Sequence, residues 1–344
     1  MLGEKKLFGT TKEGKKIFLY TLTNKNGMKA VVMNYGANLV QLWVPDKSGK
    51  MDDIVLGYDK AEYYFENSSF LGATVGPNGN RIADAAFSIE GKKYCLKANE
   101  GKNNLHSDEN FGYHKQIWDV ETRPDSVVFF LDMADGMLGF PGNKKNTVTY
   151  TLTEENELKI HYSITTDKKT ILNPTNHSYF NLSAKDSKIY DHQLMIKSDQ
   201  IACADENGLP TGEFLDVENT PFDFKSFHEI GERIHDDDEQ LKFVGGYDHC
   251  FMLKDEKDQA VLYDKESGRK LTITTTLPCM QLYAGNFLAG GSDGKFGKPY
   301  ENRDGVALEP QFLPNSMNIE KKPRVILRKD EEYEAVTTYR FETE

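Results

Sequence analysis

The chain has 344 residues, of which 38% are hydrophobic and 28% charged, as in a folded globular protein rather than a disordered one. A formal net charge of -12 argues against nucleic acid and membranes as partners. No apolar stretch approaches the roughly 18 residues of a membrane span, and the opening segment lacks the apolar centre of a secretory signal. Four cysteines without a CxxC pair are expected to be reduced, mostly buried thiols of a cytoplasmic protein.

The first half of the chain contains one short helical pattern and two hairpin patterns. Residues 59–69, DKAEYYFENSS, favour a short helix. Residues 87–96, FSIEGKKYCL, alternate around a Glu-Gly turn and predict a hairpin. The alternation is longest in residues 146–166, where apolar residues alternate with polar ones on both sides of a turn at 154–156. This stretch predicts a hairpin with one buried and one wet face.

The second half repeats the strand pattern after one more helical segment. In residues 225–234, KSFHEIGERI, Ser226 and Glu229 have the spacing of a capping box and predict the start of a short helix. Residues 260–276 predict another hairpin, and residues 331–341, EEYEAVTTYRF, predict a further strand. Many short strands separated by turns indicate an all-β sandwich or barrel, which we expect to form one domain.

Three of the eight histidines stand out by their surroundings. His106 closes a loop rich in Asn and Gly, His177 lies within NPTNHSYFNL, and His249 follows Asp248 after two glycines. His161 lies on the wet face of a predicted strand. The other four, expected on the surface because their neighbours are charged or polar, are His114, His192, His228 and His235.

Motifs for common cofactors are missing. No two histidines have i, i+2 or i, i+4 spacing and no two cysteines form a CxxC pair, which gives a zinc site weak support. A P-loop and a GxGxxG loop are also missing, and this argues against the usual nucleotide chemistries.

Glu309 follows an apolar run and precedes Pro310 and Gln311. A carboxylate at the end of an apolar strand is either paired in a salt bridge or held in a partly dry cleft, where its pKa rises. Arg81 and Asp248 could likewise simply pair with each other.

A scattered set of polar residues shares the ability to donate or accept hydrogen bonds in fixed directions. Its members are Asn80, Arg81, His106, His177, Asp248, Gln281 and Glu309. The aromatic neighbours able to stack on an apolar ligand face are Tyr179, Phe180, Tyr283 and Phe287. Directional groups beside aromatic rings suit a sugar, which has hydroxyls in fixed directions and a hydrocarbon face.

Several stretches are similar, in order, to one family. They are NYGANLVQLWVPDKSGKMDDIVLGYD (34–59), GATVGPNGNRI (72–82), NPTNHSYFNL (173–182), GYDHCF (246–251), MQLYAGNFL (280–288) and ALEPQFLPNSMN (307–318). On these motifs the chain resembles the aldose 1-epimerase family from about Phe8 to Phe341. The match around His177 is the most specific.

The resemblance implies a galactose-mutarotase-like β-supersandwich of mostly antiparallel strands, forming one domain over residues 1–344. It implies an isomerase that interconverts the α and β anomers of a free aldohexose, without metal or cofactor, as a monomer or homodimer. Glu309 would be the general base and His177 the general acid. The residues implied in sugar binding are Asn80, Arg81, His106, Ser178, Tyr179, Asp248 and Gln281.

The chain departs from the family pattern at Pro77, Lys102, Ser107–Asp108 and Pro174. The first three flank the sugar-binding loops, so we expect them to bear on substrate preference. The anomerase mechanism requires an ionised base and a protonated acid, which leads to the hypothesis that Asp248 and Glu309 hold His177 partly cationic. We also expect His177 and Glu309 to face each other across a gap of one pyranose ring.

Other functions stay open at the level of sequence. A glycoside hydrolase would use Asp248 and Glu309 as its carboxyl pair. A non-catalytic sugar-binding protein could share the same sandwich. A hexose-phosphate epimerase would need extra basic residues at the mouth of the cleft.

Overall fold

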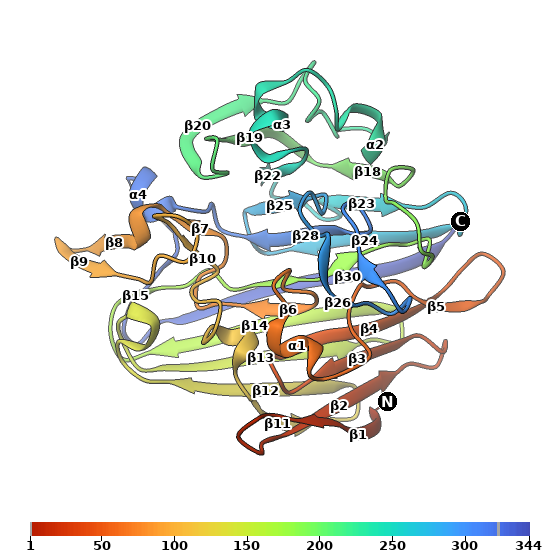
Figure 1. Cartoon of the computed structure of the whole chain (residues 1–344), viewed down its shortest axis with the longest axis horizontal. Helices are drawn as coiled ribbons and strands as arrows, with labels where there is room; N and C mark the ends of the chain where they lie inside the picture. The colour runs from red at the N-terminus through yellow and green to blue at the C-terminus, as the bar shows by residue number, and fades with distance from the viewer. Residues whose placement is uncertain (1, 322–323) are drawn as a thin grey trace.

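The computed structural model describes residues 2–321 and 324–344, except the side chain of Leu2, and consists mainly of antiparallel sheets (Figure 1). A five-stranded sheet holds β1 (Leu2–Thr10), β2 (Lys16–Thr23), β3 (Lys29–Met33), β4 (Asn38–Pro45) and β5 (Met51–Asp53). Figure 1 shows this sheet beside the longer strands of a second, nine-stranded sheet, where β2 and β3 contact that sheet.

A nine-stranded sheet forms the centre of the molecule. Its strands, in spatial order, are β11 (Asp119–Thr122), β12 (Ser126–Met133), β13 (Lys144–Leu152), β14 (Glu157–Thr166), β30 (Glu332–Thr343), β24 (Arg269–Thr275), β23 (Ala260–Tyr263), β18 (Gln193–Ile196) and β21 (His228–Glu229). The C-terminal strand β30 lies between β14 and β24, so the end of the chain joins two groups of strands that are distant in sequence.

A six-stranded sheet carries four of the candidate site residues, namely Tyr179, Asp248, Gln281 and Glu309. Its strands, in spatial order, are β17 (Tyr179–Phe180), β28 (Val306–Gln311), β25 (Cys279–Tyr283), β22 (Asp248–Leu253), β19 (Ser198–Ala204) and β20 (Pro210–Asp216). The strands come from separate parts of the sequence between residues 179 and 311, which explains why the candidate residues on them are scattered.

Short pairs and helices complete the described structure. The paired strands are β6 (Ala73–Val75) with β16 (Thr175–His177), β7 (Arg81–Ile82) with β10 (Asn104–Leu105), β8 (Ala86–Ile89) with β9 (Lys92–Cys95), β15 (Thr170–Ile171) with β29 (Ile326–Leu327), and β26 (Gly290–Asp293) with β27 (Pro299–Tyr300). The helices are α1 (Tyr63–Glu66), α2 (Ile230–Arg233), α3 (Glu239–Val244) and α4 (Ser316–Ile319), with 3-10 turns at Ala83–Ala85, Tyr113–Lys115 and Met137–Gly139. None of the described helices is long and apolar enough to cross a membrane.

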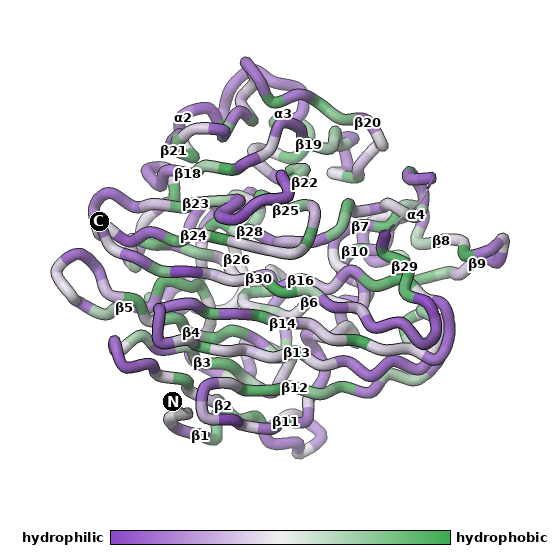
Figure 2. The backbone as a smooth tube through the Cα atoms, turned by 180° about the vertical axis from the view of Figure 1, so that it is seen from behind, coloured by the Kyte–Doolittle hydropathy of each residue, from purple (hydrophilic) through white to green (hydrophobic). Residues whose placement is uncertain are grey.

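The predicted hairpins are confirmed. β13 and β14 pair with Val148 opposite Tyr162 and Leu152 opposite Leu158, and these apolar residues are buried. The β8–β9 and β23–β24 hairpins and the strand over 331–341 also form. Figure 2 shows hydrophobic and hydrophilic residues alternating along the central strands, while many connecting loops are hydrophilic. The alternation buries one face of each sheet in a shared apolar core.

The short helix expected within 59–69 forms as α1, but the predicted capping box is wrong. Helix α2 begins at Ile230 with Glu229 as its N-cap and without a side-chain cap. Residues 228–229 instead form β21, which pairs with β18. Residues 228–229 therefore join a sheet instead of forming the first turn of a helix capped by Ser226, because tertiary context overrides a local capping preference.

All four cysteines are free thiols. Cys250 and Cys279 are buried, Cys203 is half-buried and Cys95 is exposed, so the expectation of buried thiols holds for the two on β22 and β25 only. A hydrogen bond with Cys279, and then burial, raise the pKa of the Cys250 thiol well above its ordinary value, which keeps that thiol protonated.

Candidate active site

Four neighbouring strands, β17, β28, β25 and β22, project one set of side chains into a pocket. Tyr179 and Tyr283 both lie opposite Ala307, and Tyr283 lies opposite Asp248. Two residues further along β28, Glu309 lies opposite Gln281. Because side chains two residues apart point to the same face of a strand, these groups share one face of the sheet.

The other face of the same strands belongs to the core. Leu308 and Leu282 lie opposite each other between the pocket-facing positions and are buried in the main apolar cluster. Phe180, expected from the sequence among the stacking residues, also lies in that cluster, since it follows Tyr179 on β17 and points the opposite way. That expectation is wrong for Phe180.

The pocket has a volume of about 210 Å³. The residues that line it are Ser68, Ser69, Phe70, Asn80, Arg81, Glu100, Leu105, His106, His177, Tyr179, Asp248, Tyr283, Phe287 and Glu309. Seven of the nine residues singled out in the sequence are among them, and the exceptions are Ser178 and Gln281.

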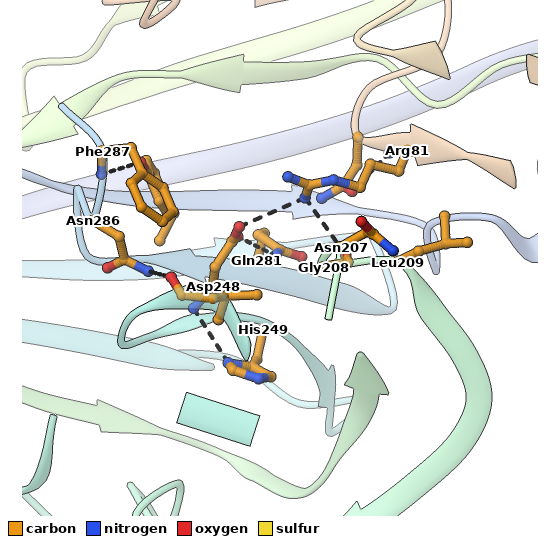
Figure 3. Close-up of polar contacts among 12 residues, drawn as sticks. Arg81, Asn207, Gly208, Leu209, Asp248, His249, Gln281, Asn286 and Phe287 are labelled. Carbon is orange, nitrogen blue, oxygen red and sulfur yellow. Dashed lines mark hydrogen bonds and ion pairs between the residues drawn. The ribbon is translucent and has the colours of Figure 1, made fainter. Parts of the chain in front are cut away.

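Ser178 and Gln281 are buried residues that do not line the pocket. The buried hydroxyl of Ser178 donates to Oδ1 of Asn176 at 2.6 Å. Nε2 of Gln281 donates to Oδ1 of Asp248 at 2.7 Å, and Oε1 of Gln281 accepts from Gln311 at 3.2 Å (Figure 3). Both residues support their neighbours in this arrangement, and a direct contact of either with a sugar stays a prediction.

His177 and Glu309 lie together at the closed end of the pocket. Nε2 of the imidazole is 3.6 Å from Oε1 of the carboxyl, and both side chains are buried. Nδ1 of His177 and Oε2 of Glu309 have no hydrogen-bond partner among the described residues. A buried donor or acceptor without a partner is costly, and such groups are retained in native structures where they serve a function.

The separation of this pair corrects the expected spacing. At 3.6 Å the two groups leave no room for a pyranose ring between them. They reach the pocket side by side, an arrangement that suits two oxygens carried by the same carbon atom rather than opposite faces of a ring. The sequence similarity therefore identifies the pair but gives the wrong distance between its members.

Burial also corrects the hypothesis of a cationic His177. Burial lowers the pKa of His177 to about 4, so the imidazole is neutral at physiological pH. Burial, and then the negative charge of Asp248, raise the pKa of Glu309 well above its ordinary value, with Arg81 acting against them. The carboxyl of Glu309 is thus the group of the pair that holds the proton, in a dry cleft rather than a salt bridge at a strand end.

His106 is held neutral and in one tautomer. The backbone N–H of Asn80 donates to Nδ1 of His106 at 3.0 Å, which places the ring proton on Nε2. Burial, and then electrostatic interactions with His177 and Arg81, lower the pKa of His106 well below its ordinary value. The ring is therefore a neutral hydrogen-bond donor on the pocket wall.

Arg81 is held by two acidic residues. Its Nε and Nη2 donate to the two carboxyl oxygens of Glu100 at 2.8 and 2.9 Å. Its Nη1 lies 3.6 Å from Oδ2 of Asp248 and 3.5 Å from the carbonyl oxygen of Gly208 (Figure 3). The pairing of Arg81 with Asp248 agrees with one sequence interpretation, whereas the closer partner Glu100 was missed.

Aromatic rings surround the histidines. Phe70 has its ring centroid 4.6 Å from that of His106 and 5.9 Å from that of His177, to which it is nearly parallel. Tyr179 lies 4.9 Å from His177. Phe287 is 70% exposed at the pocket mouth, where its ring can cover a ligand. Phe70 was missed from the sequence, and its positive φ of 56°, unusual for a bulky residue, cannot be read there.

Two histidines expected on the surface are buried. His114 packs its ring against Phe70, with centroids 4.8 Å apart. Nε2 of His192 accepts from the backbone N–H of Leu182 at 2.8 Å. Those expectations are wrong, because charged neighbours in sequence do not report on the face that a side chain presents. His235 is exposed and His228 is half-buried beside Glu232.

The residues that depart from the family pattern lie outside the inner pocket. Pro77 and Pro174 are buried, and the hydroxyl of Ser107 donates to the backbone carbonyl of Asn78 at 2.9 Å. Lys102 is exposed and pairs with Asp84. An effect of these residues on substrate preference stays a prediction.

Within residues 2–321 and 324–344, no group of three or more His, Cys, Asp or Glu side chains could hold a metal ion.

The fold and pocket define an all-β protein with a carbohydrate-type site, in which a buried imidazole and carboxyl lie among directional polar groups and aromatic rings. A family model described as aldose 1-epimerase matches residues 19–340. The chain therefore belongs to the aldose 1-epimerase family and is an isomerase.

Similar proteins cover nearly the whole chain. It is 38% identical to the aldose 1-epimerase of Escherichia coli (strain K12) over 96% of both chains, and 39% identical to the galactose mutarotase of Mus musculus over 90% of both. Among solved structures, an aldose epimerase homologue from C. elegans has a TM-score of 0.87 at 32% identity, covering 94% of this chain and 98% of its own. The galactose 1-epimerase of Lactobacillus acidophilus has a TM-score of 0.89 at 29% identity, covering 100% of this chain and 99% of its own.

Proposed function

We propose that the chain interconverts the α and β anomers of a free aldohexose such as galactose or glucose, with Glu309 as general base and His177 as general acid. The observation that carries the assignment of these roles is the buried pair itself, with Nε2 of His177 3.6 Å from Oε1 of Glu309 and one atom of each group without a partner among the described residues. The names of the similar proteins support the substrate class.

The reaction needs two proton transfers and no redox step. In ring opening, Glu309 takes the proton of the C1 hydroxyl while His177 gives a proton to the ring oxygen, and the bond between C1 and the ring oxygen breaks. Rotation about the C1–C2 bond then turns the aldehyde. On reclosure His177 takes the proton back from the ring-oxygen hydroxyl, and Glu309 returns its proton to the former carbonyl oxygen. Each proton transfer by a positioned group contributes about 10²–10⁴-fold.

His177 and Glu309 together carry one titratable proton. The reaction requires only that this proton move from one group to the other. That proton is on Glu309, since burial favours two neutral groups over two charged ones. Moving the proton to His177 creates the charged pair that the reaction uses, without exchange with solvent. A sugar hydroxyl that donates to the carboxyl of Glu309 stabilises the carboxylate and favours this transfer.

The other members of the pocket would bind the sugar. His106, as a neutral donor, and Arg81 and Asn80 would meet hydroxyls, while Tyr179 would pack against the ring. Asp248 is fixed by Gln281 and Arg81, which suits a binding role rather than that of a free acid.

The pH dependence of kcat/KM should be a broad bell. Below about pH 4 His177 gains a proton while Glu309 still holds its own, so the pair has no base. At high pH the pair loses its single proton and has no acid. We expect the acid limb near pH 4 in polarimetry corrected for the spontaneous rate. An acid limb near the ordinary histidine value of 6.5 would contradict the one-proton pair.

Replacing Arg81 by alanine should mainly raise KM, by about 10- to 100-fold, because hydrogen bonds to a charged group contribute about 1.5–3 kcal/mol. The value of kcat should change by less than about threefold, since Arg81 is assigned to binding. The matched control is Arg123→Ala, which removes an exposed arginine paired with Glu121. A loss confined to kcat would contradict the binding role.

The direct test is polarimetry of freshly dissolved α-galactose and α-glucose with catalytic amounts of protein. Faster decay of optical rotation than in buffer is expected for at least one of the sugars. An unchanged rate would refute the proposal. Release of reducing ends from an oligosaccharide would instead indicate a glycoside hydrolase, which the family does not favour.

We also propose that the chain acts as one catalytic domain in the cytoplasm, as a monomer or homodimer. The continuity of the apolar core, which takes residues from β2 to β30, supports the single domain.

A further inference from the structure

A second cavity opens beside the inner pocket. It has a volume of about 460 Å³ and shares Arg81, Glu100, Asp248 and Phe287 with that pocket. The residues found only in this outer cavity are Gly101, Lys102, Asn103, Glu206, Asn207, Phe243 and Val244. Any charged substituent on a bound sugar that extends towards this cavity therefore meets Arg81 and Glu100.

Arg81 has no free pair of parallel N–H donors with which to bind an anion. An arginine binds a carboxylate or phosphate group best through two parallel N–H donors. Glu100 already occupies Nε and Nη2 with both of its carboxyl oxygens, and Asp248 and a backbone carbonyl lie near Nη1. An incoming phosphate or carboxylate would have to displace one of these oxygens (Figure 3).

The charges around Arg81 also disfavour an anion. Two carboxyl groups, those of Glu100 and Asp248, line the pocket with this one arginine, and a third, Glu309, is held protonated by burial. Arg81 is half of a bidentate ion pair with Glu100, so its positive charge is largely compensated at the mouth. Lys102, the other basic residue of the outer cavity, is directed to Asp84 and is mostly exposed. Like charges in a shared cavity repel, which penalises a negatively charged ligand.

We propose that Glu100 is a specificity-determining residue, which restricts the site to uncharged aldoses by occupying Arg81 and by adding negative charge where the inner pocket meets the outer cavity. This inference rests on the proposed anomerase activity and extends it to substrate selection. Sugar 6-phosphates and hexuronates are excluded even though an arginine lies on the pocket wall.

The test compares Glu100→Gln with Glu206→Gln. Glutamine at position 100 keeps the shape and one acceptor for Arg81 but removes the charge and frees part of the guanidinium. Glu206 lines the outer cavity but is not among the described contacts of Arg81, so its replacement removes the same charge from the same cavity. Polarimetry would give kcat/KM for a neutral hexose, its uronic acid and its 6-phosphate.

We expect the preference for the neutral hexose over the anionic sugars to fall by about tenfold in Glu100→Gln, a modest change for loss of one partly exposed charge. Glu206→Gln should change it by less than about twofold. Inorganic phosphate should inhibit Glu100→Gln competitively at concentrations that leave the wild type unaffected. High salt should reduce the difference between the two variants in their preference for neutral over anionic sugars.

Two results would overturn the inference. One is an equal rise in KM for neutral and anionic sugars in Glu100→Gln, which would show that Glu100 only positions Arg81 and does not select between substrates. The other is an equal loss of discrimination in both variants, which would indicate general cavity charge. Failure of the proposed function is distinguishable, because the wild type would then show no activity towards the neutral hexose.

Discussion

Replacing Glu309 by glutamine is expected to lower kcat by about 10²–10⁴-fold, the usual contribution of one positioned proton-transfer group. Glutamine has nearly the same shape but cannot take the proton of the C1 hydroxyl. The variant would be assayed by polarimetry at neutral pH. The control is Glu334→Gln, which changes an exposed glutamate on β30 that pairs with His161.

The stability of Glu309→Gln separates catalysis from folding. The folded-state pKa of Glu309 lies above its ordinary value of 4.5, so between these two values the folded protein binds more protons than the unfolded chain. The free energy of unfolding of the wild type therefore falls as pH rises through this window, and the variant lacks this loss. At neutral pH the variant should melt at a higher temperature than the wild type, and the two should converge towards pH 4. Near-normal activity in a folded variant would remove Glu309 from its role.

Replacing His177 by asparagine should reduce kcat by a similar factor of about 10²–10⁴. Asparagine can still donate a hydrogen bond to the ring oxygen but cannot transfer a proton to it. The acid limb near pH 4 should also disappear from the residual activity, since it reports the titration of this imidazole. The matched control is His161→Asn on the half-exposed face of β14.

The double variant tests whether the two groups act as one unit. If one proton moves between them, removing either group already abolishes the transfer, and the loss in Glu309→Gln/His177→Asn should be close to that of a single variant. If the fold-losses in kcat of the two single variants instead multiply in the double variant, Glu309 and His177 contribute independently. A His177→Asn variant with wild-type kcat would exclude this histidine as the acid.

Local alternation made much of the sheet structure predictable. The hairpin over 146–166 follows from side chains that must alternate between core and water, a constraint contained within one short segment. Assembly of the site was predictable only through the family motifs, because His177 and Glu309 meet through strands distant in sequence. The alternation places Glu309 on a strand but does not say which strand lies beside it.

The errors have a common physical origin in tertiary contacts. Glu100 comes from a loop whose charged and Gly-rich sequence is typical of a solvated turn, yet it binds Arg81 from across the pocket mouth. His114 is buried because Phe70 covers it, and Ser226 caps no helix because sheet pairing takes the next residues. The protonation of His177 depends on burial, which no neighbouring residue in the sequence reveals.

The strict alternation on β28 and β25 has a consequence for how this protein can change over time. Ligand-contacting and interior side chains occupy separate odd and even positions, so Glu309 can be exchanged without touching its neighbour Leu308 in the interior. Mutations that adjust sugar selectivity can therefore accumulate on one face while the opposite face goes on holding the sandwich together. Because the two faces are separate, substitutions that change the chemistry of the pocket need not destabilise the fold. These strands are therefore a good starting point for laboratory evolution of new carbohydrate isomerases.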